Sequence, residues 1–203
     1  EFPEFDVGQR SAASIARRIQ DPLSELVKID PKSIGVGQYQ HDMNQKKLGE
    51  ALTSVVEDCV NKVGVDLNTA SAPLLSYIAG ITKTAAKNII LYREENGKFT
   101  DRKQLKKVSK IGPKAYEQCA GFLRINDGYN PLDATSVHPE SYDACKKLID
   151  ILGFNIRDIK GGIPNIKSHI KDKKALAAKV GIGEETLSDI ISELEKPGRD
   201  PRL

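Results

Sequence analysis

Lysines and glycines at two similar turns are the residues of this chain with the clearest chemistry. An apolar helical segment, a turn that contains Gly80 and a second helix opened by Lys83 follow one another, and the same order returns around Gly112 and Lys114. A tight turn before a helix leaves the first N–H groups of that helix unpaired, and the helix dipole adds positive charge there. Both turns are therefore predicted to bind a phosphate group.

The candidate binding residues combine backbone access with positive charge. Each turn glycine is expected to let a phosphate strand come close, because glycine has no side chain and tolerates left-handed backbone angles. Amide groups read no base, so the predicted contact is independent of sequence. The candidates are Gly80, Ile81, Thr82, Lys83 and Lys87 at the first turn, and Arg102, Lys103, Lys106, Lys107, Lys110, Ile111, Gly112 and Lys114 at the second.

The positive charge of the chain is concentrated around these turns. The whole chain has a net charge of +3, whereas residues 66–125 alone hold 11 Lys and Arg against 5 Asp and Glu. A basic patch is often only a solvated face, and an apolar hairpin with a glycine turn is a common packing unit. Two turns in tandem, each followed by lysine, favour phosphate binding over these alternatives.

A third turn, Gly181-Ile182-Gly183, is predicted to be structural. Glu184 and Glu185 occupy the start of the helix that follows it. Carboxylates at this position interact favourably with the helix dipole and repel phosphate.

Composition limits the function classes that remain. The chain lacks a run of eighteen apolar residues and an N-terminal secretory pattern, so neither a membrane span nor a signal is predicted. Cys59, Cys119 and Cys145 are few and scattered, which is typical of reduced thiols in the cytoplasm. Tryptophan is absent and aromatic residues make up 5% of the chain, so base stacking is not expected to dominate binding.

Apolar periodicity and capping residues predict a mainly helical chain. Asn68 or Ser71 can cap the helix before the first turn, and Asp101 can cap the helix before the second. A strand is expected at Ser33–Tyr39, with its sheet outside this chain or with the segment extended along the helices. The expected helices are Val7–Gln20, Leu23–Val27 after Pro22, Met43–Val63, Pro139–Gly153, Lys173–Val180 and Glu184–Leu194.

The sequence resembles two known families at different levels of detail. Val108–Lys114 is close to the helix-hairpin-helix pattern, whereas the first turn has Gly-Ile-Thr where that family usually has Gly-Ile-Gly. Longer runs resemble the Tex family of bacterial transcription accessory proteins, namely Asp30–Asp42, Val56–Asn61, Asn68–Leu75, Asn130–Ala134, Val137–Glu140 and Pro197–Arg202.

The resemblance to the Tex family implies a domain plan for an internal fragment. Residues 1–42 would end a ribonuclease-H-like YqgF domain of α/β type, and residues 43–127 would form a long helix and the tandem helix-hairpin-helix domain. Residues 128–196 would form a small wedge domain with the third hairpin, and 197–203 a linker to an OB-type domain. The resemblance also implies a cytoplasmic bacterial protein that binds DNA or RNA during transcription, and we expect a monomer.

Two other functions have to be weighed against nucleic-acid binding. A nuclease is one, because YqgF-like folds include resolvases. Asp6, Asp21 and Asp30 are the candidates for a two-metal site in the N-terminal piece. Asp21, before Pro22, is more simply a helix cap. We therefore expect no enzymatic activity. The other is a scaffold that docks on RNA polymerase or another transcription protein.

No cofactor or metal is expected. His41, His138 and His169 lie far apart, with no cysteine at ligand spacing. The sequence has no Walker loop and no dinucleotide-binding fingerprint.

Overall fold

The computed structural model describes residues 3–170 and 172–197, and in this part the chain is mainly helical, as predicted. Two short strands, β1 (Val65–Asp66) and β2 (Leu123–Arg124), are the β structure among these residues. The α-helices are α1 (Val7–Gln20), α2 (Pro22–Leu26), α3 (Gln45–Val63), α4 (Ala72–Leu75), α5 (Lys83–Asn96), α6 (Pro113–Cys119), α7 (Tyr142–Leu152), α8 (Lys173–Val180) and α9 (Glu184–Glu195). The 3-10 helices are η1 (Pro31–Ile34), η2 (Arg102–Lys107), η3 (Pro131–Ala134), η4 (Pro139–Ser141), η5 (Ile156–Gly161) and η6 (Ile166–His169). The predicted linker at 197–203 lies outside the described residues from position 198 onward.

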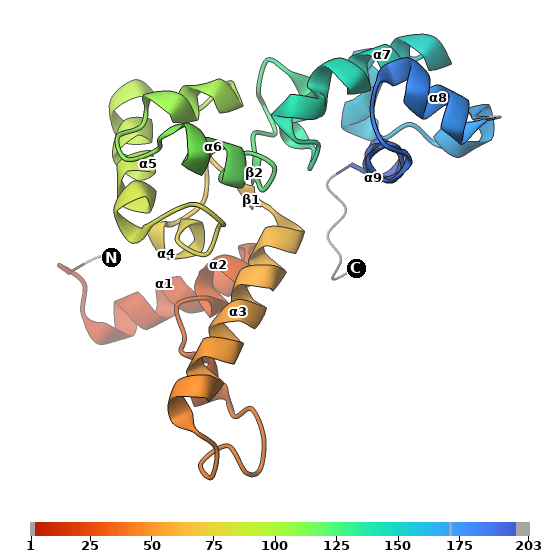
Figure 1. Cartoon of the computed structure of the whole chain (residues 1–203). Coiled ribbons are helices and arrows are strands. Elements are labelled where there is room, and N and C mark those ends of the chain that lie inside the picture. The colour runs from red at the N-terminus through yellow and green to blue at the C-terminus, as the bar shows by residue number, and fades with distance from the viewer. Residues whose placement is uncertain (1–2, 171, 198–203) are drawn as a thin grey trace.

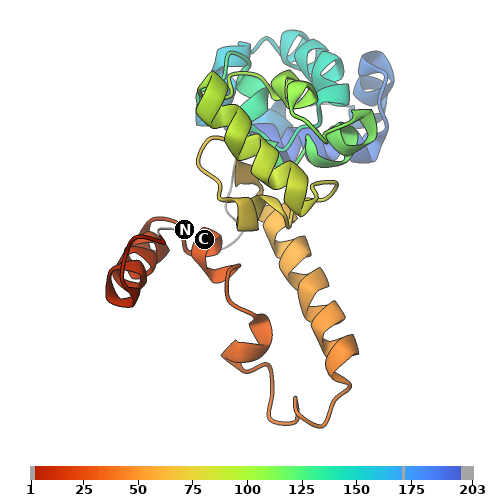
Figure 2. The same ribbon diagram turned by 90° about the vertical axis from the view of Figure 1, so that its left-hand side faces the viewer.

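The helices after α3 form two groups, one on each side of the strands. Figure 1 shows α4, α5 and α6 together on one side of the strands and α7, α8 and α9 on the other. The long helix α3 leads into β1 from below, and Figure 2 shows the loop between η1 and α3 closing at the far end of that helix. The two candidate binding turns, at Gly80 and Gly112, both lie in the group that contains α4 to α6.

Side-chain caps and glycines set most helix boundaries. Asp6 caps α1, and the predicted helix Val7–Gln20 is confirmed. The predicted helix Met43–Val63 is confirmed from Gln45, after the Asn44 cap, and it ends at Gly64 with φ of +75°. Ser71 caps α4, which resolves the choice between Asn68 and Ser71, and Asp101 caps η2 as expected.

The predicted strand at Ser33–Tyr39 is wrong. Pro31–Ile34 form a 3-10 helix that Asp30 caps, and Gly35 follows with φ of +86°. The Gln40 side chain then closes the loop, because its amide donates to Lys32 O at 3.1 Å and its oxygen accepts from Val36 N at 2.7 Å. Alternating apolar and glycine residues suggested a strand, but proline, a capping carboxylate and a left-handed glycine fold the segment locally.

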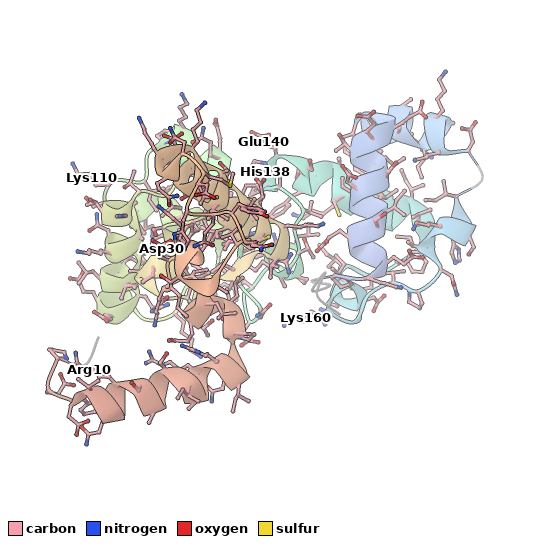
Figure 3. All side chains as sticks on the ribbon, turned by 90° about the horizontal axis from the view of Figure 1, so that it is seen from below. Arg10, Asp30, Lys110, His138, Glu140 and Lys160 are labelled. Carbon is pink, nitrogen blue, oxygen red and sulfur yellow. The ribbon has the colours of Figure 1, made fainter. Side chains whose placement is uncertain are left out.

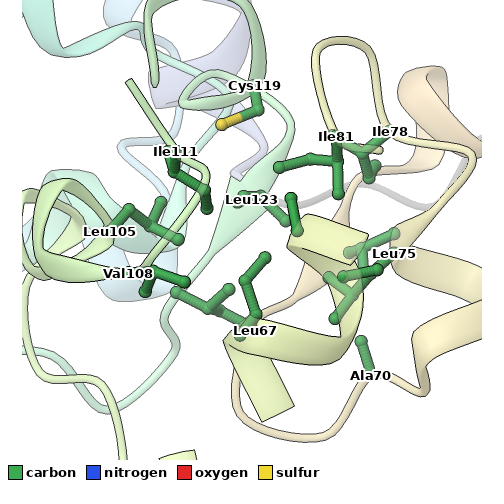
Figure 4. Packing of buried hydrophobic residues seen from close by; sticks show 14 of the residues in the cluster. Leu67, Ala70, Leu75, Ile78, Ile81, Leu105, Val108, Ile111, Cys119 and Leu123 are labelled. Atoms are coloured by element: carbon green, nitrogen blue, oxygen red, sulfur yellow. The ribbon is translucent and has the colours of Figure 1, made fainter. Parts of the chain in front are cut away.

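The first core fills the space between the two turns. Figure 4 shows Ile81 and Ile111, one from each turn, directed into the same cluster as Leu67 and Leu123. The parallel pair β1–β2 aligns Val65 with Leu123. The segment that contains both turns therefore has its two ends paired with each other. Each candidate turn is thus anchored by a buried isoleucine.

The second core lies under α7, α8 and α9. Leu148, Ile159, Leu187 and Leu194 are fully buried in it. The predicted helix Pro139–Gly153 starts as η4 and continues as α7, and the two predicted helices of the third hairpin are confirmed as α8 and α9. The third hairpin therefore packs into a core separate from that of the first two.

Candidate nucleic-acid interface

All three turns follow the same backbone path. A left-handed residue comes first, with φ of +80° at Gly80, +71° at Lys110 and +81° at Gly181. An isoleucine follows, and an extended residue then caps the next helix: Thr82, Gly112 or Gly183. The structural equivalent of Gly80 is therefore Lys110, whereas Gly112 corresponds to Thr82. The sequence prediction that paired Gly80 with Gly112 is wrong by two positions.

Gly80 has a packing role that the sequence analysis did not predict. A Cβ at this position would lie 2.8 Å from Gln118 Cβ and 3.1 Å from Ala115 O on α6. Gly80 is needed so that the first turn can press against the helix of the second hairpin. Its predicted role in admitting a phosphate is corrected accordingly, because α6 takes the space that the missing side chain leaves.

The two hairpins support one another reciprocally. Gln118, which meets the first turn, is the sixth residue of α6. Asn88, the sixth residue of α5, donates from Nδ2 to Ser109 O in the second turn at 2.8 Å. Each turn therefore contacts the same position, the sixth residue, of the helix in the other hairpin. This arrangement holds the starts of α5 and α6 on one unit of the molecule.

The two helix starts differ in how far they are capped. Thr82 Oγ1 accepts a hydrogen bond from Ala85 N at 3.2 Å, so one of the N–H groups at the start of α5 already has a partner. Gly112 gives α6 no side-chain cap, and a Cβ there would meet nothing within 4 Å. Gly112 thus faces open space, which is the property that had been expected of both turn glycines.

Exposed lysines surround both helix starts. Lys83 and Lys87 lie on the first two turns of α5, and Lys103, Lys107, Lys110 and Lys114 lie on η2, its turn and α6. Figure 3 shows Lys110 at the outer edge of the hairpin group. Within the described part of the chain, none of these six forms an ion pair. Lys106 differs, because its Nζ lies 4.5 Å from the centre of the Tyr116 ring.

Ile81 and Ile111 are not surface residues. Their side chains are only 6% and 5% exposed. Their backbone N–H groups donate within the turns, to Ile78 O at 3.0 Å and to Val108 O at 3.1 Å. Their predicted direct contact with nucleic acid is therefore wrong, and they position the turns instead.

Arg102 is buried, so its predicted contact with phosphate is also wrong. It is 1% exposed, and its guanidinium donates to Leu123 O at 2.7 Å, to Val137 O at 2.8 Å and to Thr135 O. It also donates to the Tyr142 hydroxyl at 2.8 Å. These partners belong to both helix groups, so Arg102 fastens the two together.

A buried carboxyl completes the junction around Arg102. Asp133 accepts from Arg102 N at 3.1 Å and from the Tyr142 hydroxyl at 2.6 Å. Burial raises the pKa of Asp133 above its ordinary value, although these two hydrogen bonds oppose the effect. The sequence counted Arg102 among the cations because the residue type alone does not reveal carbonyl partners twenty or more positions away.

The three carboxylates considered for a nuclease are helix caps. Asp6 accepts from Gln9 N, Asp21 from Leu23 N and Ser24 N, and Asp30 from Lys32 N. Asp21 therefore has the capping role that was predicted. In residues 3–170 and 172–197, no group of three His, Cys, Asp or Glu side chains is arranged to hold a metal ion.

Sequence reasoning missed Asn88 and Gln118, the residues that lock the hairpins together. Their signal in the sequence is positional: each stands five residues after the first residue of the helix that follows its turn. That signal could be read only once the equivalence of Gly80 and Lys110 was known.

Three anchored turns, two of them packed reciprocally beneath exposed lysines, define a tandem helix-hairpin-helix protein. The family model described as helix-hairpin-helix motif matches residues 60–124, and the one described as HHH domain matches residues 130–202.

Comparison with curated proteins identifies the family. The chain is 58% identical over 202 residues to Protein YhgF of Escherichia coli and 57% identical over 202 residues to Transcriptional accessory protein Tex of Neisseria gonorrhoeae. Both alignments cover 100% of this chain and 26% of the relative. S1 RNA-binding domain-containing protein 1 of Homo sapiens is 40% identical over 251 residues, covering 97% of this chain and 25% of that protein. The chain belongs to the Tex family, and it spans about a quarter of the length of these relatives.

Among the helices of residues 3–170 and 172–197, none combines the length and the hydropathy of a membrane-spanning segment.

Proposed function

We propose that this chain binds the phosphate backbone of nucleic acid, without sequence preference, through its first two hairpin turns. One observation carries this proposal: reciprocal packing places the exposed, unpaired Lys83, Lys110 and Lys114 beside the starts of α5 and α6 on one unit. Amides at helix starts and lysines both favour phosphate oxygens. Neither reads base edges, so DNA and RNA of any sequence are expected ligands.

The relatives support a role of the whole protein in transcription. One carries the name transcriptional accessory protein, and another is named for an S1 RNA-binding domain. We propose that the longer protein acts in the cytoplasm, that YqgF-like and OB-type domains flank this segment, and that RNA polymerase or nucleic acid is its partner.

We propose binding without catalysis for this segment. Asp6, Asp21 and Asp30 are each engaged with backbone amides at separate helix starts. Incubation of the chain with single-stranded and duplex substrates in Mg²⁺ or Mn²⁺ should leave the substrates intact. Metal-dependent cleavage would contradict the proposal.

A lysine surface could also dock an acidic protein, and charge-reversal variants test whether nucleic acid binds at the first two turns. The test variant is Lys83→Glu/Lys110→Glu/Lys114→Glu. Its matched control is Lys173→Glu/Lys174→Glu/Lys179→Glu, which changes the net charge equally on the exposed side of α8 in the third hairpin. The two variants differ in which hairpin loses its charge, so any general effect of net charge affects both.

Anisotropy of labelled duplex, hybrid and single strands measures the outcome. The test variant should lose binding to all of them, whereas the control should stay within about threefold of the original chain, because only long-range attraction falls. Equal loss in both variants would show that net charge alone drives binding. Unchanged binding in the test variant would remove the first two turns from the site.

A further inference from the structure

A groove of about 450 Å³ opens beside the first turn, where α2, α4 and the start of α5 meet. Its volume falls within the range of pockets that hold small ligands, roughly 300 to 1,000 Å³. Lys83 and Lys87 of the candidate interface line one side of it. The groove is therefore continuous with the lysines to which the phosphate backbone is assigned.

The groove also has apolar lining residues, among them an aromatic ring. Val27, Pro73 and Tyr77 line it, and Tyr77 is half-buried against the first core. Among the described residues, the Tyr77 hydroxyl has no hydrogen-bond partner. An aromatic face with a free polar tip suits a planar ligand that also carries polar groups.

The cations of the groove are not equivalent. Lys28 also lines it, but its Nζ is held by Glu25 Oε1 at 2.7 Å. Lys83 and Lys87 are exposed, one helical turn apart, and neither forms an ion pair with a described residue. The unneutralised charge of the groove therefore lies on α5, beside the turn.

Building on the function proposed above, we propose that this groove takes one unpaired nucleotide of a single strand, with its base on Tyr77 and its phosphates on Lys83 and Lys87. Stacking of a base on an aromatic ring beside a basic track is how single strands are held without sequence preference. A base inside a duplex is not available, because taking it out of the stack costs a few kcal/mol. Tyr77 thus adds to single-strand affinity and not to duplex affinity.

Substitution of Tyr77 tests this site. Tyr77→Leu should weaken binding of a labelled oligothymidylate roughly five- to tenfold and leave a duplex of equal length unaffected, because one stacked base is lost. Tyr77→Phe keeps the ring and should bind within about twofold of the original chain. Tyr129→Leu is the matched control, since Tyr129 is 86% exposed and lies outside the groove.

Photocrosslinking keeps the site testable if Tyr77→Leu folds poorly. An oligonucleotide that carries iodouracil, irradiated with the unmodified 203-residue chain, should attach to Tyr77, as peptide mass spectrometry would show. The site would be overturned by undiminished single-strand affinity in well-folded Tyr77→Leu, or by crosslinks that avoid Tyr77. If the Lys83→Glu/Lys110→Glu/Lys114→Glu variant still loses all binding in either case, only the groove proposal is refuted, and the proposed function stands. If that variant binds normally, the proposed function itself fails.

Discussion

Lys110 is both a candidate binding residue and a residue with a strained backbone. Its φ of +71° lies where the equivalent positions have Gly80 and Gly181. A left-handed backbone costs a non-glycine residue of the order of 1 to 2 kcal/mol. The chain therefore keeps a cation at a position where glycine would be more stable, as is common at functional sites.

Replacing Lys110 should separate stability from binding. Lys110→Gly relieves the strain and should raise the free energy of unfolding. The gain should be about 1 kcal/mol or less, because the extra entropy of glycine in the unfolded chain offsets part of the relieved strain. The same change removes a lysine beside α6, so affinity for nucleic acid should fall. Urea unfolding and duplex titration measure the two effects. Lys107→Gly is the control: it removes the same charge from η2 and should lower stability. A loss of stability in Lys110→Gly would refute this view of the turn.

Arg102 shows that neighbouring cations can have opposite roles. Arg102→Met would remove the side-chain donors to Leu123, Val137, Thr135 and Tyr142 and leave buried oxygens without partners. Breaking a buried charged network costs roughly 3 to 5 kcal/mol. The adjacent, exposed Lys103→Met should change stability by about 0.5 kcal/mol or less. Urea unfolding of both variants would contradict the assignment if their losses were similar.

At the scale of elements, Glu25 ties α1 to α2. Glu25 is 4% exposed and accepts from Ser14 Oγ at 2.8 Å and from Lys28 Nζ at 2.7 Å, with Arg17 3.7 Å away. Burial alone would raise the pKa of Glu25, but the hydrogen bonds from Lys28 and Ser14 and the nearby charges lower it below 4.5. The ionised carboxylate therefore stabilises the folded corner.

The pH dependence of this corner follows from the lowered pKa. Because the folded-state pKa of Glu25 lies below the unfolded one, its contribution is present above about pH 4.5 and is lost as the pH falls through the folded value. Glu25→Gln should thus speed hydrogen exchange of the α1 amides at pH 7, and the difference should shrink below pH 4.5. Arg18→Gln, at the exposed end of α1, neither adds nor removes a group that titrates in this range, so it should show no such convergence. A difference that stays constant with pH would exclude ionised Glu25 as the tie.

Elements bounded by local signals could be predicted from the sequence. Asp21 and Asp101 cap helices, and Gly64 ends one, because capping and left-handed angles depend on a few adjacent residues. The error at Ser33–Tyr39 has a different cause. A strand needs a partner, and alternation of residue types within one segment cannot show whether a partner exists.

At the scale of the whole molecule, the candidate site was only partly predictable. The concentration of lysine between residues 66 and 125 pointed to the group of helices that holds the first two turns. It did not distinguish exposed Lys103 from buried Arg102, because that difference depends on carbonyls supplied by the junction with the second group. Nor did it reveal the groove beside Tyr77, since Val27 and Lys28 line it from a segment far in sequence from Tyr77.

The salt dependence of duplex binding tests the central claim, namely that phosphates bind at the two reciprocally packed turns. If Lys83, Lys87, Lys110 and Lys114 each neutralise one phosphate, the logarithm of the binding constant should fall against that of the salt concentration with a slope of roughly −3 to −4. The Lys110→Gln/Lys114→Gln variant should have a slope shallower by about 2. The same slope in the variant and in the original chain would contradict the claim.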